Sequence, residues 1–157
     1  AVLGGRPPTL ADLPKLTYTG MVVSETLRLY PTVWMLGREA IEPVRLGDYE
    51  VPVGMTIFMP EWTVHRDPRW FDDPETFRPE RWSEANRESI HRYAYFPFGG
   101  GPRICIGNNF ALMEASLLLA SIAGRFRLQL APDADVVPLP TITLRPAKGV
   151  KVVVRGA

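Results

Sequence analysis

The chain has 157 residues, of which 46% are hydrophobic and 22% are charged, and its formal net charge is +1. That length suits one domain with its own core, and the balanced charge gives no electrostatic reason to expect nucleic acid or an anionic membrane as a partner. No apolar run reaches the ~18 residues that a bilayer-spanning helix needs. The single cysteine excludes an intrachain disulfide and favours a reducing compartment.

The first predicted element is a helix over residues 17–29. Apolar and charged side chains recur there at steps of three and four, from Met21 to Leu29, and Pro31 follows the last turn. Residues 44–60 carry β-branched and aromatic residues around two turns rich in glycine, proline and aspartate, so short strands are predicted there.

Residues 60–96 contain several prolines and show little periodicity. We predict ordered coil with short helical turns, a pattern that is usually functional when it is this long. A second helix is predicted over residues 108–123, with Gly124 as its stop. This helix is apolar nearly all round, so we expect it to be buried. The segments FRLQL, TITLRP and VKVVVR are predicted strands.

The stretch FPFGGGPRICIG, residues 96–107, places three glycines, a proline and an arginine just before Cys105. A thiol that precedes a helix N-terminus has its thiolate stabilised by the helix dipole and by free backbone N–H groups, and Arg103 adds positive charge. The glycines allow positive φ and a close approach to a flat group. An isolated free cysteine, by contrast, is often a small buried hydrophobe beside a turn.

Four functional interpretations of Cys105 compete. A nucleophilic thiolate needs a histidine base, and neither His65 nor His91 stands in a pattern typical of a dyad. A zinc site needs three or four ligands, which one cysteine and two scattered histidines support poorly. A phosphate-binding loop fails on spacing, because Ile104 occupies the place of the third glycine. A thiolate bound to a planar metal cofactor accounts for the glycines, the arginine and the helix together.

The segment FGGGPRICIG, residues 98–107, resembles the haem-binding loop of the cytochrome P450 family in its phenylalanine, its glycines, its basic residue and its cysteine. The resemblance implies that Cys105 is the catalytic axial thiolate of a haem b iron, that Arg103 pairs with a haem propionate and that Phe98 packs beside the sulfur. Gly99 and Gly107 would give the cofactor clearance. Thiolate ligation of this kind favours cleavage of the O–O bond.

Two more motifs, ETLR and FRPERW, precede the loop in the order typical of the family's C-terminal part. Taken alone, Glu25 and Arg28 would be a solvated ion pair on one helix face. The resemblance implies instead that Glu25, Arg28 and Arg81 form a buried charged triad, structural in role, that fixes the coil beneath the haem. His65, in the segment HRDP, is interpreted as a turn and packing residue and not as a ligand.

The segment PTVWMLGREA resembles the family's stretch that passes the haem edge, which makes Arg38 a second candidate propionate partner. Trp34 and Met35 have plain core packing as an alternative role. LPTITLRP resembles a late hairpin whose tip touches substrate. The resemblance therefore assigns substrate-pocket positions to Val33, Trp34, Met35, Leu36, Thr141, Ile142 and Thr143.

The predicted fold is α+β: the C-terminal portion of the mainly helical cytochrome P450 fold, with two main helices, small antiparallel β-sheets and the proximal cysteine-ligand loop. The resemblance extends over residues 1–157, and the family's distal helix with its acid–alcohol pair is absent from them. We therefore expect a C-terminal haem-binding fragment of a single domain, inactive when isolated.

The parent protein is expected to be a haem-thiolate monooxygenase. It would insert one oxygen atom from O₂ into a small apolar organic substrate, with electrons from a ferredoxin or a flavoprotein reductase. A haem-thiolate isomerase or peroxygenase is the alternative among enzymes, and a non-enzymatic haem-binding remnant is the alternative outside them. A cytoplasmic location is expected, with a membrane anchor in a preceding segment left open.

Overall fold

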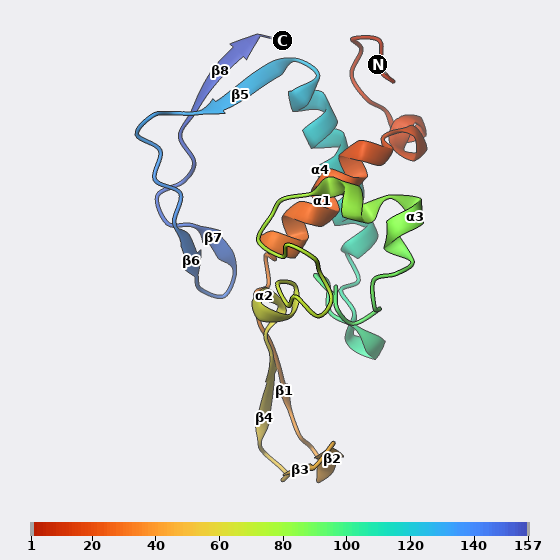
Figure 1. Cartoon of the computed structure of the whole chain (residues 1–157), viewed down its shortest axis with the longest axis vertical. Helices are drawn as coiled ribbons and strands as arrows, with labels where there is room; N and C mark the ends of the chain where they lie inside the picture. Colours follow the sequence, from red (N-terminus) through yellow and green to blue (C-terminus); the bar gives the residue numbers. More distant parts are fainter. Residues whose placement is uncertain (1, 157) are drawn as a thin grey trace.

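The computed structural model describes residues 2–156, and its two longest elements are the helices α1 (Thr17–Leu29) and α4 (Asn108–Ala123). Both helices have the bounds predicted from the sequence. They pack against each other at the centre of the molecule, and the small sheets extend away from them (Figure 1). α1 ends where the Tyr30 N–H donates to the Thr26 carbonyl (2.7 Å), one residue before Pro31.

Within the described residues, the strands form four two-stranded antiparallel sheets. The pairs are β1 (Leu36–Glu39) with β4 (Thr56–Met59), β2 (Val44–Leu46) with β3 (Tyr49–Val51), β5 (Phe126–Leu130) with β8 (Val152–Gly156), and β6 (Pro138–Pro140) with β7 (Leu144–Pro146). The β1–β4 ribbon projects from the helices and carries β2–β3 at its far end (Figure 1). The predicted α+β class, with two main helices and small antiparallel sheets, is confirmed.

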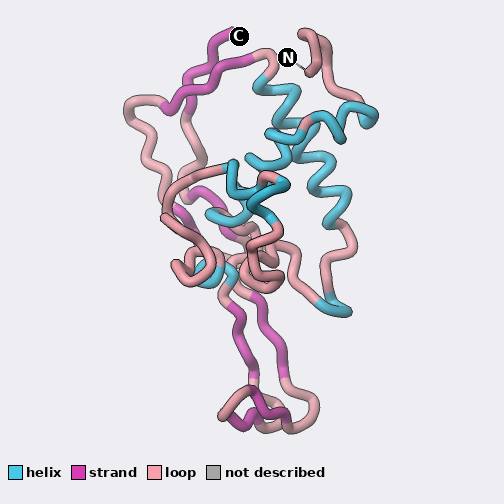
Figure 2. Tube along the Cα trace, turned by 45° about the vertical axis from the view of Figure 1, so that its right-hand side comes forward, coloured by secondary structure: helices cyan, strands magenta, loops and turns pink. Residues whose placement is uncertain are grey.

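The chain between β4 and α4 is coil interrupted by short helical turns, as predicted. These turns are α2 (Glu61–Val64), η2 (Pro79–Trp82), α3 (Glu84–Arg87) and η3 (Gly101–Arg103), and a further 3₁₀ helix, η1 (Leu10–Lys15), precedes α1. Figure 2 shows how much of the molecule consists of loops and turns. η2 packs against α1, so this coil is attached to the first main helix.

The interior of the molecule contains charged side chains as well as apolar ones. Val23 and Leu29 of α1 are buried, and Phe71 of the following coil is 2% exposed. Arg28, Glu25, Glu61 and His65 are also fully buried. Burying ionisable groups is costly unless they find partners, so the arrangement of these partners decides how the coil is held.

The prediction that α4 is buried is wrong. Among its residues only Ala120 is buried, while Phe110 is 63% exposed and Leu118 is 55% exposed. The helix packs mainly against α1, η1 and β5. Gly124 does stop the helix, but in a right-handed conformation (φ −73°) rather than as a left-handed cap. No helix in residues 2–156 is long and apolar enough to cross a bilayer.

Candidate functional site

The loop of residues 96–107 is closed by its own backbone and leads directly into α4. The Gly99 N–H donates to the Phe96 carbonyl (2.8 Å), and the Cys105 N–H donates to the Phe98 carbonyl (2.9 Å). Gly99 and Gly101 have φ of +76° and +67°. Side chains rarely adopt such angles, so glycine is needed at these two positions for the loop to form.

The thiol of Cys105 is exposed, so its interpretation as a small buried hydrophobe is wrong. A Cβ placed on Gly107 would lie 3.9 Å from Cys105 Sγ, so Gly107 lies immediately beside the sulfur. α4 begins at Asn108, and its first N–H groups have no carbonyl partners within the helix. The arrangement therefore presents an accessible sulfur at the positive end of a helix.

The other protein groups around Cys105 do not complete a nucleophile–base pair or a protein metal site. His65 is buried and accepts a hydrogen bond from the loop backbone through Nε2, while Nδ1 of His91 accepts one from the Tyr93 N–H. No group of three His, Cys, Asp or Glu side chains in the described chain is arranged to hold a metal ion. A single exposed sulfur donor fits a metal whose other ligands belong to a cofactor.

Two arginines near the loop have no carboxylate partner in the described part of the chain. Arg103 and Arg38 are both exposed and form no ion pair there, and Arg38 donates only to the neighbouring Gly37 carbonyl (2.8 Å). Leu36, two residues earlier on β1, lies 3.5 Å from where a Cβ on Gly99 would be. Because strand residues two apart share a face, Arg38 lies on the face of β1 that meets the cysteine loop.

The structure brings the two candidate pocket segments together. Trp34 Nε1 donates to the Thr141 carbonyl (2.7 Å), and the Leu144 N–H donates to the Thr32 carbonyl (2.8 Å). Residues 33–36 are half-buried, whereas residues 141–143 at the tip of the β6–β7 hairpin are exposed. Trp34 and Met35 are thus half-buried, and Trp34 lies against the tip of the hairpin.

Residues 96–107 around Cys105 are exposed or half-buried, so they do not enclose the sulfur. A hollow of about 450 Å³ lies between the N-terminal loop and the end of α4, and another of about 340 Å³ lies beside Trp62 and Arg66. Neither hollow is lined by residues 96–107.

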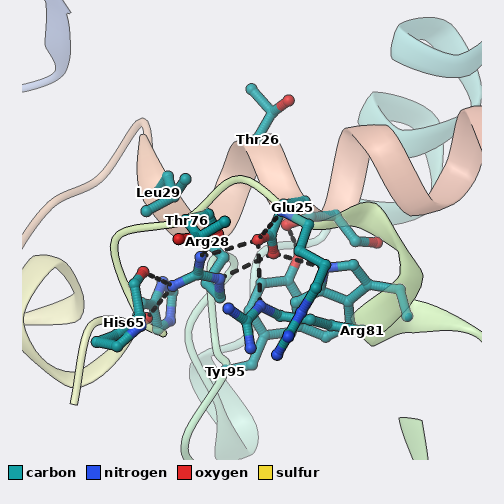
Figure 3. Close-up of polar contacts among 12 residues, drawn as sticks. Glu25, Thr26, Arg28, Leu29, His65, Thr76, Arg81 and Tyr95 are labelled. Carbon is teal, nitrogen blue, oxygen red and sulfur yellow. Dashed lines mark hydrogen bonds and ion pairs between the residues drawn. The ribbon is translucent and has the colours of Figure 1, made fainter. Parts of the chain in front are cut away.

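Beneath this loop, Glu25 and Arg28 form a fully buried, two-pronged ion pair. Arg28 Nε lies 2.8 Å from Glu25 Oε2, and Arg28 Nη2 lies 2.8 Å from Oε1. Arg81 Nε approaches Oε1 at 3.4 Å, with its side chain 5% exposed. Figure 3 shows the three side chains converging below α1, while Thr26 points away from them. The interpretation of Glu25 and Arg28 as a solvated surface pair is therefore wrong.

Further hydrogen bonds satisfy this carboxylate. Burial alone would raise the pKa of Glu25, but hydrogen bonds from Arg28, from the Arg78 N–H (2.9 Å) and from Trp82 Nε1 (2.9 Å) outweigh it, and they hold that pKa below its ordinary value. The carboxylate is thus charged, and both of its oxygens accept hydrogen bonds from groups of α1 and of the later coil.

The buried guanidinium groups attach the same coil to α1. Arg28 Nη1 donates to the carbonyls of His65 (2.8 Å) and Pro74 (2.6 Å), and Nη2 donates to the Thr76 carbonyl (3.2 Å). Arg81 Nη2 donates to the Asp73 carbonyl (2.7 Å). We refer to Glu25, Arg28, Arg81 and these backbone partners as the buried charge network.

Two buried ionisable groups, in α2 and at its end, have environments that the sequence pattern does not predict. Glu61 has no hydrogen-bond partner on either carboxylate oxygen among the described residues, and burial raises its pKa to about 8. His65 accepts a hydrogen bond from the Phe96 N–H (3.0 Å), and burial lowers its pKa to about 4. A glutamate after Pro60 gives no local pattern that signals burial, and the segment HRDP by itself indicates only a turn.

Comparisons with known proteins identify the family of the chain and agree with its mixed fold. The cytochrome P450 family model matches residues 1–154. The chain is 43% identical over 143 residues to cyclooctatin synthase from Streptomyces melanosporofaciens, covering 91% of this chain and 31% of that protein. It is 42% identical over 158 residues to the Arabidopsis thaliana protein LUTEIN DEFICIENT 5, chloroplastic (98% and 27% covered). It is also 43% identical over 135 residues to cyclooctat-9-en-7-ol 5-monooxygenase from S. melanosporofaciens (86% and 29% covered).

An exposed cysteine lies in a glycine loop at a helix N-terminus, together with two arginines that form no ion pair in the described residues, and this arrangement fits a cofactor held through sulfur. The chain belongs to the cytochrome P450 family, and this membership implies a haem cofactor. The chain spans about 30% of the length of these curated relatives.

Proposed function

We propose that residues 1–157 form the C-terminal haem-binding part of a single cytochrome P450 domain, and that the whole protein is a haem-thiolate monooxygenase. The observation that carries the proposal is the exposed Cys105 thiol in a backbone-closed glycine loop at the start of α4. A relative that is 43% identical over 135 residues and is named a monooxygenase supports the reaction class.

Haem b fits the residues that surround the thiol. Cys105 would bind the iron through sulfur, with Phe98, Gly99 and Gly107 beside it. Arg38 and Arg103 would pair with the propionates, since both are exposed and have charge to offer. The bound group, with a thiolate ligand, supplies the chemistry that activates O₂.

The remaining residues act by positioning and by excluding water. The buried charge network holds residues 65–82 on α1, so Glu25, Arg28 and Arg81 have a structural role and no contact with substrate. The half-buried residues 33–36, joined to the tip of the β6–β7 hairpin, would line the pocket for a small apolar organic substrate. The pocket residues are Val33, Trp34, Met35, Leu36, Thr141, Ile142 and Thr143.

Electrons would come from a ferredoxin or a flavoprotein reductase, and O₂ would be the co-substrate. We also propose a cytoplasmic location, which rests on the single unpaired cysteine. Turnover that requires both the electron donor and O₂ supports the monooxygenase, whereas turnover without either of them would assign an isomerase.

The ligand assignment is tested with Cys105→Ser in the full-length, haem-loaded protein. The reduced carbonyl complex of the unaltered protein should show the red-shifted Soret band of thiolate ligation, and the serine variant should lose it. Ile106→Val is a matched control, because it alters a fully exposed neighbour in the same loop and leaves the sulfur in place. Survival of the red-shifted band in Cys105→Ser would show that another residue ligates the iron.

A further inference from the structure

His65 joins the buried charge network to the cysteine loop through two different atoms. Its carbonyl oxygen accepts a hydrogen bond from Arg28 Nη1 (2.8 Å), and its Nε2 accepts one from the Phe96 N–H (3.0 Å). The residue is fully buried, and 31 positions separate it from Phe96 in the chain. One residue, through its backbone carbonyl and its imidazole, therefore connects α1 with the start of the loop that carries Cys105.

The imidazole is held in the state that this connection needs. Burial lowers the His65 pKa to about 4, so the ring is neutral near pH 7 and its Nε2 lone pair is free to accept. The proton of the neutral ring is then on Nδ1, which has no hydrogen-bond partner in residues 2–156. The rings of Tyr95 and Phe96 pack against it, with centroids 5.3 Å and 5.2 Å away.

The atom that His65 binds is the first link in the backbone of the loop. The Phe96 carbonyl accepts from the Gly99 N–H (2.8 Å), and the Phe98 carbonyl accepts from the Cys105 N–H (2.9 Å). His65 and the Gly99 N–H hold the two sides of the same residue, Phe96, and the Gly99 N–H shares its peptide with the Phe98 carbonyl that binds Cys105. A change in the position of Phe96 therefore alters the direction of the Cys105 backbone, and with it the position of the sulfur.

We propose that His65 is a positioning residue for the Cys105 thiolate: its Nε2 anchors the Phe96 N–H and so couples the Glu25–Arg28 ion pair to the cysteine loop. This inference rests on the proposed function, because it takes Cys105 to be the haem ligand. It assigns His65 a role beyond turn formation and packing, and it does not make His65 a ligand or a base.

The test compares two variants in the full-length, haem-loaded protein. His65→Phe keeps an aromatic ring and removes the acceptor, whereas His65→Gln places an amide oxygen that reaches the position of Nε2. Groups that orient a metal ligand typically contribute ~10–100-fold to metal affinity. We therefore expect His65→Phe to lose haem to an apomyoglobin trap about 10–100-fold faster, on the scale typical of such orienting groups. Its reduced carbonyl complex should also show a larger share of the unshifted Soret band. His65→Gln should restore most of both properties.

The outcomes separate this inference from the proposed function. Absence of the red-shifted band in the unaltered protein would refute haem-thiolate ligation itself. If that band is present and His65→Phe keeps it, with unchanged haem loss, the positioning role is wrong. Equal damage in folded Phe and Gln variants would show that the acceptor does not matter and would also overturn it. If only His65→Gln folds, haem loss close to that of the unaltered protein supports the positioning role, and much faster loss contradicts it. Failure of both variants to fold would show that the role of His65 is purely structural.

Discussion

Glu61 offers the most direct test of how this fold treats a buried charge. Its side chain has no exposure, and neither carboxylate oxygen has a hydrogen-bond partner in the described residues. Burial raises its pKa from 4.5 to about 8. The substitution Glu61→Gln keeps the shape and removes the ionisation, so it isolates the effect of the charge.

The sign of the effect follows from proton linkage. Because the folded pKa of Glu61 is raised, its contribution to stability is complete below about pH 4.5 and is lost as pH rises toward 8. Each pH unit well inside that window changes the free energy of unfolding by about 1.4 kcal/mol. Because the slope is smaller near each of the two pKa values, the loss between pH 5 and pH 8 is about 3–4 kcal/mol. His65 acts in the opposite direction, since its pKa is lowered to about 4 and its contribution is lost as pH falls below 6.5.

Urea unfolding of the unaltered protein and of Glu61→Gln, at several pH values between 5 and 8, measures the difference between their free energies of unfolding. All other groups, including His65, are shared by both proteins, so subtracting the two free energies leaves the contribution of Glu61. The free energy of unfolding of Glu61→Gln, relative to that of the unaltered protein, should increase steadily as pH rises. Glu88→Gln, at an exposed position, is the matched control and should give a constant difference. A constant difference for Glu61→Gln as well would mean that Glu61 is ionised and solvated in the folded protein, and the reasoning would fail.

The charge network and the arginines give two further predictions. Glu25→Gln leaves two buried guanidinium groups without their carboxylate and should lower the free energy of unfolding by about 3–5 kcal/mol. Glu75→Gln, at an exposed ion pair, is the control and should lower it by less than about 1 kcal/mol. Equal urea midpoints for the two variants would contradict the buried network. Arg38→Leu and Arg103→Leu should each speed haem loss to an apomyoglobin trap, and Arg45→Leu, on β2, should not. Unchanged loss in both of the first two would assign the propionates to other residues.

The main helices were predictable because local signals mark both of their ends. Residues 17–29 have helical periodicity and stop before Pro31, and residues 108–123 lie between Gly107 and Gly124. β1 was not predicted, because LGRE contains a glycine and two charges and becomes a strand only by pairing with β4. The burial of α4 was mispredicted because composition shows what a surface prefers, and it does not show which elements cover it.

The candidate site likewise has one part that the sequence predicts and another that it does not. The cysteine loop is a local motif, so its glycines, its arginine and its thiol are recognisable in the amino-acid sequence alone. The environments of His65 and Glu61 depend on segments distant in the chain, since Nε2 meets a backbone group 31 residues away. A single sequence carries no signal for such a contact, because the donor is a peptide N–H that every residue except proline possesses.

The buried charge network also implies an order of events during folding. Glu25 and Arg28 are three positions apart and can pair as soon as α1 forms, but Arg78 and Trp82 reach Glu25 across 53 and 57 positions. A helix of 13 residues is marginal by itself, and an ion pair in water adds little to it. Closing a loop of about fifty residues has an entropic cost that precedes the contacts it permits. We therefore expect α1 to remain unanchored on a nascent chain until residues 65–82 have been synthesised, and then to become fixed in one cooperative step.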